Sequence, residues 1–432
     1  MTELTRSLGL WTATGIGIGA IIGTGIFVLI GVAAGLAGPS VILSFLVAGS
    51  VALLSGLSAA ELSSFITEAG ASYIYTTKAF GAFAGFIVGW MKSFDYIIGA
   101  SAVSLGFAAY LAYFVGISPA NTTLVAIGTI WPLFLMLLNL KGMKEASGAN
   151  NVLVILKVSA LVLLIAIGGY HILFHGDYSY YSPFFPNGIR GMLTGASIIF
   201  FAFIGFNTVA MVAEEVKDPE RNVHRAIILS FAICTLLYIG VAIVAVGLVD
   251  WQTLGTSKAP LELALGIATD NPFLLKFVAV SALFATTSVI LSSMIGASRA
   301  LFAMARKGVI PPVLAKVSSR GIPSAAVILS GVVISLIVLL TNADLEWLAS
   351  IFNFGTPLTF FFINASLLQL RRTMPDANRR FSVPLYPYTP VLGLASCIAL
   401  ALFLNINAII AGAGWISVGV LAYVINSRQE EK

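Results

Sequence analysis

Runs of apolar residues long enough for membrane helices alternate with short polar connections along almost the whole chain. A helix needs about 20 mostly apolar residues to cross a hydrocarbon core of about 30 Å. The runs predict twelve membrane-spanning helices, at residues 8–35, 40–65, 80–115, 121–140, 148–170, 193–214, 223–250, 272–305, 323–341, 345–370, 388–406 and 408–427. Because this number is even, both ends of the chain are expected on the same side of the membrane.

The composition agrees with this pattern. Of the 432 residues, 59% are hydrophobic and only 9% are charged, whereas soluble domains carry about 25% charged residues. The composition excludes a soluble globular protein and predicts an all-α polytopic protein embedded in a lipid bilayer. The net charge of +5 does not indicate nucleic-acid binding, because the basic residues concentrate in short connections between spans.

The distribution of Lys and Arg predicts the orientation of the chain in the membrane. Arg190, Lys258 and Lys276 fall in outer connections, and Lys92 and Lys157 lie within spans. The remaining Lys and Arg residues lie at the termini, in the connections on the termini's side, or at the span ends that border them. The positive-inside rule therefore predicts a multi-pass protein of the cell membrane with both termini in the cytoplasm.

The cysteines and histidines indicate no metal or redox site. Cys234 and Cys397 both lie in apolar runs, without C-x-x-C spacing. The three histidines lie in apparent connections and lack the spacing of a ligand set: His171, His175 and His224. We expect no metal and no cofactor. A membrane enzyme is disfavoured for the same reason, and a channel is disfavoured because the sequence contains no repeated pore-lining element.

Two of the predicted spans contain sequences that weaken a helix. The first holds GIGIGAIIGTGIF at residues 15–27, and the sixth holds FFAFIGFNTVA at residues 200–210. Each glycine disfavours a helix by about 1 kcal/mol relative to Ala. Three of the five glycines in the first span are four residues apart, which also suits close packing against a neighbouring helix, but Gly25 departs from that row.

The two interruptions lie five spans apart, in corresponding halves of the chain. Paired interruptions of this kind indicate an inverted-repeat transporter with its binding site near the membrane midplane. Backbone N–H groups that are freed at the start of a half-helix suit a carboxylate, with help from the positive end of the helix dipole.

Five longer motifs carry a family resemblance, and they occur in the family's order along nearly the whole chain. They are GIGAIIGTGIF, AELSSFITEAGASYIYTTKAFG, GFNTVAMVAEEVKDPERNVHRAI, GASRALFAMARKGVIPPVLAKVSSRGIPSAAV and FSVPLYPYTPVLG. The chain resembles the amino acid–polyamine–organocation (APC) superfamily, and within it the prokaryotic relatives of the cationic amino acid transporters.

The resemblance implies a LeuT-type fold with a 5+5 inverted repeat, broken helices 1 and 6, and two additional helices. Its parts would be a first repeat at 1–170, an extracellular loop at 171–192, a second repeat at 193–370, a cytoplasmic connection at 371–387, and two helices with a cytoplasmic tail at 388–432.

The resemblance also implies a substrate site. The α-carboxylate of an amino acid would bind backbone N–H groups of Gly23, Thr24 and Gly25. Its α-amino group would bind carbonyls of the two unwound segments, and one aromatic residue of span six would close over it. The residues concerned are Ile21, Phe201, Ala202, Phe203 and Ile204, with Phe201 or Phe203 as the gate.

One position suggests the charge of the substrate. Asn207 stands where the cationic branch often has an acidic residue, and its neutrality favours a neutral or broad substrate range. Small residues at Gly19, Ala20 and Gly205 leave room in the pocket.

Lys157 lies well inside the fifth span. A Lys at the centre of a membrane helix costs about 2.5–3.5 kcal/mol, so it requires a partner. Snorkelling or pairing with a carbonyl would explain it structurally. The resemblance implies instead that Lys157 replaces the cation of sodium-coupled relatives and carries a proton, since desolvation favours a neutral amine. Its expected partners are the backbone near Gly19 and a hydroxyl among Thr286, Thr287 and Ser288.

Other charged residues allow two interpretations. Asp95 could form an i,i+3 ion pair with Lys92, or it could lie near the pocket and neutralise a substrate amine or pair with Lys157. Lys92 itself has no counterpart in the family pattern. The sequence pair Glu214 and Glu215 follows span six and could be a solvated charge cluster. Alternatively, the pair could form an inner-gate salt bridge with Arg299.

These features predict a secondary active amino acid transporter that couples uptake to protons and works by alternating access. An amino acid exchanger of the same fold is the alternative. The expected partners are the amino acid substrate, protons and the lipid bilayer. No feature of the sequence specifies an oligomeric state.

Overall fold

The computed structural model describes residues 6–23, 25–68, 70–117, 120–141, 143–175, 178–257, 259–342, 345–401 and 406–430. Thr24, one of the predicted substrate-binding residues, lies outside these ranges. In the described part of the chain every regular element is helical, and the one extended pairing is an isolated bridge between Leu8 and Val216. This confirms the all-α prediction.

The first half of the described chain contains nine principal helices. They are α1 (Leu10–Ile21), α2 (Ile30–Ala37), α3 (Val41–Ser63), α4 (Ser72–Phe80), α5 (Ala82–Val115), α6 (Asn121–Asn139), α7 (Met143–His175), α8 (Gly188–Ile199) and α9 (Asn207–Met211). Between them lie the π-helical segment η1 (Gly25–Leu29) and the 3₁₀ segments η2 (Gly38–Ser40), η3 (Tyr178–Tyr181) and η4 (Phe200–Phe206).

The second half follows a similar pattern of long helices and short connecting ones. Its helices are α10 (Pro219–Leu248), α11 (Trp251–Thr256), α12 (Pro260–Ala268), α13 (Pro272–Arg306), α14 (Ser324–Leu340), α15 (Leu345–Thr373), α16 (Tyr388–Ala401) and α17 (Ile406–Glu430). The short segments η5 (Ala213–Glu215) and η6 (Pro312–Ala315) precede α10 and α14.

Seven helical stretches within the described ranges are long and apolar enough to cross a membrane. The first of them, Leu10–Ser63, contains two of the predicted spans. Three shorter helices, Ser324–Leu340, Tyr388–Ala399 and Ile409–Val424, are also apolar. These findings support a polytopic membrane protein, while the number twelve and the inverted repeat remain predictions.

Some helices lie where the sequence pattern predicted connections. α4 precedes the third predicted span, and α11 and α12 occupy the connection before α13. α7 continues to His175 and α8 begins at Gly188, so both enter the range predicted as an extracellular loop. These helical additions are short or lie at the ends of spans, where a long apolar run gives no signal.

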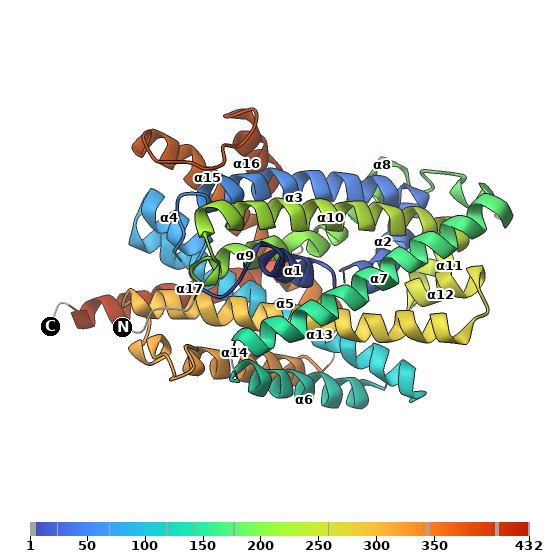
Figure 1. Ribbon diagram of the computed structural model, residues 1–432, viewed down its shortest axis with the longest axis horizontal. Helices are drawn as coiled ribbons and strands as arrows, with labels where there is room; N and C mark the ends of the chain where they lie inside the picture. Colours follow the sequence, from blue (N-terminus) through green and yellow to red (C-terminus); the bar gives the residue numbers. More distant parts are fainter. Residues whose placement is uncertain are drawn as a thin grey trace.

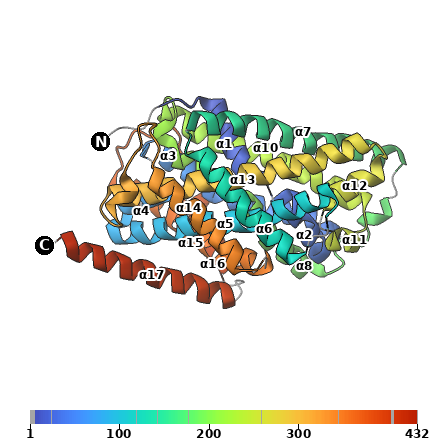
Figure 2. The same ribbon diagram turned by 90° about the horizontal axis from the view of Figure 1, so that it is seen from below.

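The long helices α3, α10 and α13 run nearly parallel along the long axis of the molecule, and α7 crosses the view obliquely (Figure 1). The short helix α1 lies among them and packs on α10, α7 and α13. α17 lies along one edge of the bundle (Figure 2), where it contacts α15 and α5. The interrupted first span is therefore at the centre of the bundle.

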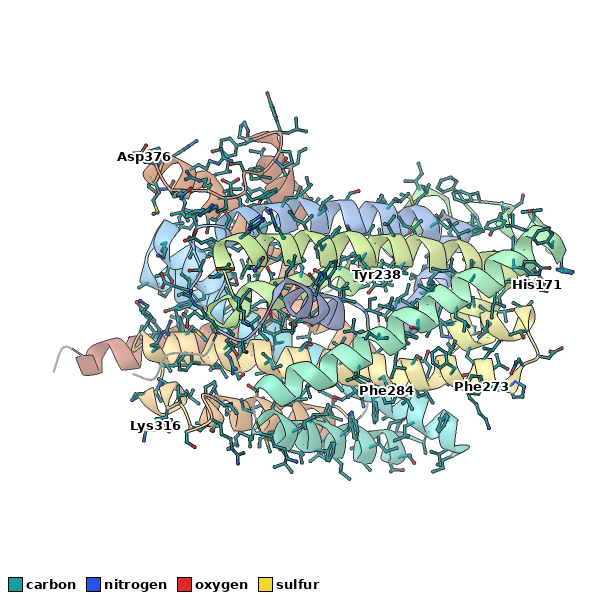
Figure 3. All side chains as sticks on the ribbon, viewed as in Figure 1. His171, Tyr238, Phe273, Phe284, Lys316 and Asp376 are labelled. Atoms are coloured by element: carbon teal, nitrogen blue, oxygen red, sulfur yellow. The ribbon has the colours of Figure 1, made fainter. Side chains whose placement is uncertain are left out.

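The labelled residues in Figure 3 mark the two ends and the middle of the molecule. Lys316 and Asp376 lie at one end, His171 and Phe273 at the other, and Tyr238 and Phe284 between them (Figure 3). Large apolar side chains are exposed on the outer faces of many helices: Ile155, Leu236, Leu340, Leu392, Ile410 and Leu421. Large apolar side chains that face outward on this many helices suit contact with lipid.

The two interrupted spans cross in direct backbone contact. α1 ends at Ile21 and helical structure resumes at Gly25, while α8 gives way to η4 at Phe200. A Cβ atom on Gly205 would lie 2.5 Å from both the carbonyl oxygen of Ala20 and the N atom of Ile21. A Cβ atom on Gly25 would lie 2.6 Å from the Cα atom of Ala202. Glycine is required at both positions because a side chain would push the segments apart.

We predict that Gly205→Ala destabilises the protein. The added methyl group must displace backbone atoms, and overpacking of this kind costs about 1–3 kcal/mol. The apparent melting temperature of the purified protein in detergent measures the effect. Gly169→Ala in α7 is the matched control, because its Cβ would meet open space and Ala favours a helix. A Gly205→Ala protein that melts as high as the wild type would contradict the backbone contact.

Candidate functional site

A cavity of about 40 Å³ lies where the two interruptions meet. Its lining comes from α1, η1, α5, η4, α9, α13 and α15 and includes polar groups of Lys92, Asp95, Tyr96, Thr208 and Ser293. A volume of this size has room for a few water molecules. A larger ligand can therefore enter only when the surrounding helices move apart.

Five residues predicted for the substrate site line this cavity: Ile21, Gly23, Gly25, Asp95 and Ile204. The other predicted residues do not line the cavity or lie, in whole or in part, outside the described structure. Ala202 and Asn207 are buried but are not part of the lining. The side chain of Phe201 is outside the description.

Phe203 does not cover the cavity in this conformation. Its ring is fully buried and packs on Phe45, Phe231 and Tyr238, at centroid distances between 5.2 and 6.5 Å. The gate role that the sequence offered to Phe201 or Phe203 is thus not visible in the position of Phe203. Nearly every residue of η4 is apolar, so the sequence pattern does not show which side of this segment faces the cavity.

The carbonyl groups at the end of α1 receive hydrogen bonds from three side chains. The ammonium of Lys157 donates to Gly19 O and Ile22 O, at 2.7 Å each. Ser288 donates to Gly19 O at 3.2 Å. The hydroxyl of Tyr238 donates to Ile21 O at 2.8 Å. The last carbonyls of a helix lack partners within it, and these side chains supply them.

Tyr238 also connects the two interruptions. Its hydroxyl lies 3.3 Å from the carbonyl oxygen of Ala202 in η4, in addition to its bond with Ile21 O. The residue is fully buried in α10. Sequence reasoning missed it, because a single Tyr in an apolar span gives no indication of which distant carbonyl it reaches.

Lys157 is fully buried and forms no ion pair with any carboxylate in the described ranges. Its third acceptor is Ser288 Oγ, at 3.2 Å. Gly19 and Ser288 are among the partners named from the sequence. Thr286 and Thr287, also named there, donate instead to carbonyls of their own helix. A positive charge at a helix C-terminus is favourable, so carbonyl dipoles of α1 balance the ammonium.

Lys92 and Asp95 form a buried pair on α5. Lys92 Nζ lies 3.6 Å from Asp95 Oδ2, and Thr356 donates to the same oxygen at 3.2 Å. The i,i+3 ion pair considered from the sequence is therefore present. Asp95 is not paired with Lys157, whose polar partners are the carbonyls and Ser288. Because both residues also line the cavity, the ion pair and a role near the substrate are compatible.

Ion pairs close the bundle beyond α9. Arg299 lies 3.1 Å from Glu215, and both side chains are buried. Arg306 contacts Glu214 at 2.9 Å. The N–H groups of Ser7 and Leu8 donate to Glu215 O, which ties the start of the chain to the same place. The sequence suggested the partner Arg299 but gave no signal for the backbone pairing.

A second charge cluster holds the connection between α15 and α16. Glu61 of α3 is fully buried and accepts two hydrogen bonds from Arg371, at 2.7 and 2.8 Å. It also accepts from the N–H of Val383 at 2.6 Å. The hydrogen bond with Glu61 raises the pKa of Arg371 above its ordinary value. Glu61 was not singled out in the sequence, although it lies in one of the quoted motifs.

An all-helical bundle with an apolar exterior, two interrupted helices and a central cavity that contains polar groups is typical of a membrane transport protein. The chain belongs to the amino acid permease family, whose model matches residues 8–425. It is accordingly a permease and not an enzyme, and the family resemblance stated from the motifs is confirmed.

Three relatives show the range of the family. The chain is 33% identical to a branched-chain amino acid permease of Bacillus subtilis, with all of this chain and 95% of the relative covered. It is 34% identical to a methylthioribose transporter of the same organism, over 99% of this chain and 94% of the relative. It is 33% identical to the vacuolar cationic amino acid transporter 2 of Arabidopsis thaliana, over 87% of this chain and 61% of the relative.

We predict that Tyr238→Phe destabilises the protein although it preserves the shape of the core. Without the hydroxyl, the carbonyl of Ile21 loses its donor and the carbonyl of Ala202 loses its weaker contact with the same hydrogen, and an unpaired buried polar group costs about 1–3 kcal/mol. Thermal unfolding in detergent measures the loss. Tyr388→Phe is the control, because Tyr388 is 69% exposed. Equal melting temperatures for Tyr238→Phe and wild type would refute the bridging role.

Proposed function

We propose that the protein is a secondary active amino acid transporter of the cell membrane that couples uptake to protons by alternating access. In this proposal the chain has twelve spans with cytoplasmic termini, a LeuT-type repeat made of residues 1–170 and 193–370, and two additional helices. The observation that carries it is the ammonium of Lys157 on the carbonyls of broken helix α1.

The proposed carboxylate site is the start of η1. N–H groups in the first turn of a helical segment have no acceptor within it, and such a position suits an anion. Gly23 and Gly25 line the cavity there. The proposal places the substrate carboxylate on these N–H groups and includes Thr24 between them.

The proposed site for the α-amino group is on carbonyls of α1 and η4. Ile21 and Ile204 line the cavity from the two segments. The Ile21 carbonyl already accepts from Tyr238, but a carbonyl oxygen has two lone pairs and can accept a second donor. The substrate would thereby occupy polar backbone groups that the breaks leave available.

The proposed coupling mechanism follows from the number of donors on Lys157. An ammonium has three N–H donors, and the structure gives it three acceptors: Gly19 O, Ile22 O and Ser288 Oγ. A neutral amine has only two donors and no charge, so one acceptor loses its bond and the others are held more weakly. Loss of the proton would therefore loosen α1 and link proton release to its movement.

The ion pair between Arg299 and Glu215 also restrains this movement of α1. Opening the cytoplasmic end would require Arg299 and Glu215 to separate. Breaking a buried pair is costly unless water or new partners replace the lost contact. In the proposed cycle, the bound substrate and the release of the proton from Lys157 together shift the balance toward the open arrangement.

The relatives support amino acid transport, but they do not indicate which amino acid is the substrate. Their names describe branched-chain, cationic and methylthioribose substrates. Methylthioribose has neither a carboxylate nor an amino group, so a competition assay separates it from amino acids. Exchange is separated from proton symport by uptake into vesicles that contain no amino acid.

We predict that proteoliposomes with an acidic exterior concentrate a radiolabelled amino acid, and that Lys157→Ala abolishes this uptake. The variant removes the only group assigned to carry the proton. Lys276→Ala is the control, because Lys276 is exposed at the outer end of α13.

Three outcomes would contradict the proposal. A Lys157→Ala protein that still concentrates substrate with a proton gradient would remove the coupling role. Wild-type uptake that requires internal amino acid would establish exchange, and uptake driven only by a Na⁺ gradient would replace the proton as the coupling ion.

A further inference from the structure

Lys92 is a buried cation at the edge of the cavity that forms no hydrogen bond in the described part of the chain. Its side chain is fully buried, it lines the cavity, and its Nζ atom has no acceptor within hydrogen-bond distance. The nearest opposite charge, Asp95 Oδ2, lies 3.6 Å away. The ring of Tyr96 lies below it, with its centroid at 4.7 Å. The ammonium of Lys92 therefore has N–H groups that can donate hydrogen bonds to a ligand in the cavity.

Contacts with α13 show how far Lys92 lies from the break in α1, because both regions pack against this helix. Gly23 packs on Val289, and Gly296 packs on Tyr96. Val289 and Gly296 are seven residues apart, which corresponds to about 10 Å along a helix. Tyr96 therefore lies at the end of the cavity opposite the proposed carboxylate site. Lys92 lies one turn farther in the same direction, because Gly89 of the same helix packs on Met304. A substrate held by its α-carboxylate at the break would direct its side chain toward this end.

Asp95 is fixed in place and does not supply the missing acceptor. Its Oδ2 atom accepts from Thr356, and its Oδ1 atom lies against Gly355 of α15. The hydrogen bond from Thr356 and the contact with Gly355 hold the carboxylate at its distance from Lys92. The pair presents an adjacent positive and negative charge to the cavity, with no net charge.

We propose that Lys92 and Asp95 form a side-chain subsite that selects amino acids with a carboxamide side chain, as in glutamine and asparagine. The inference rests on the proposed function, because it assumes that an amino acid binds at the break. The carboxamide oxygen accepts from the ammonium of Lys92, and the carboxamide N–H groups face the carboxylate of Asp95. Hydroxyls of Tyr96 and Thr208 line the same region and can complete the contacts.

The same pair disfavours other side chains. Because the two charges are 3.6 Å apart, a cationic side chain that is attracted by Asp95 is also repelled by Lys92, and an anionic one that is attracted by Lys92 is also repelled by Asp95, so neither gains a net attraction. An apolar branched side chain removes water from both charges without replacing its hydrogen bonds. A site that is built to bond a polar substrate group rejects analogues that lack it, often by large factors. The chain would thus differ in selectivity from the branched-chain and cationic relatives.

Binding to the wild-type protein tests this directly. Purified protein in detergent is heated with glutamine, asparagine, glutamate, leucine or lysine, and the ligand concentration that raises the melting temperature is compared, since a ligand of the folded state stabilises it. We expect glutamine or asparagine to act at concentrations at least about ten-fold lower than the other three. Leucine, lysine or glutamate acting at an equal or lower concentration would overturn the inference.

A double variant tests the residues themselves. Lys92→Met together with Asp95→Asn removes both charges and leaves no unpaired buried ion. The ratio of glutamine to leucine uptake should fall about ten-fold or more relative to wild type, whereas Lys276→Met should leave the ratio unchanged. An unchanged ratio in the double variant would overturn the inference. If the double variant does not fold, the wild-type binding order alone decides.

The failure of this inference can be distinguished from failure of the proposed function. Proton-driven uptake of leucine with no preference for glutamine would refute the subsite and leave the transporter proposal intact. Absence of binding and uptake for every amino acid would refute both.

Discussion

A helix that breaks inside a membrane leaves carbonyl and N–H groups without partners, and lipid cannot supply them. In this protein the carbonyls at the end of α1 are bonded by Lys157, Ser288 and Tyr238, which come from three different helices. The break is stable only while α7, α10 and α13 hold these side chains in place. The arrangement of the central bundle follows from this requirement.

The same interactions determine what remains open for a ligand. Side chains cover the carbonyl side of the break, and Gly25 and Gly205 allow the two interrupted segments to approach until their backbones touch. The cavity lies at this crossing and continues along α5 to Lys92 and Asp95. Backbone groups thus stand at one end of the cavity and a pair of charges at the other. For this reason we assign the α-carboxylate, which all amino acids share, to the backbone groups, and the side chain, which differs between amino acids, to the pair of charges.

The sequence predicted the helical class and located both interruptions, because apolar length and glycine content are local properties. It also named Lys157, and it offered Arg299 as a possible partner of Glu214 or Glu215 beside the alternative of a solvated charge cluster, since a buried charge requires a partner and few candidates exist. It did not indicate Tyr238, whose acceptor Ile21 lies 217 positions away. It named Phe201 or Phe203 as the gate and did not indicate that the ring of Phe203 packs on Phe45, Phe231 and Tyr238. Contacts of this kind depend on how distant helices rotate against each other, which a pattern of apolar residues does not specify.

The central claim is that the broken backbone of α1 binds the substrate carboxylate while Lys157 holds the other side of the break. An experimental structure of the protein with a bound amino acid tests it most directly. The account predicts the α-carboxylate within hydrogen-bond distance of the N–H groups at Gly23 and Gly25, and the Lys157 ammonium still on α1. A carboxylate bound to the ammonium of Lys92, with the N–H groups at the break unoccupied, would contradict it.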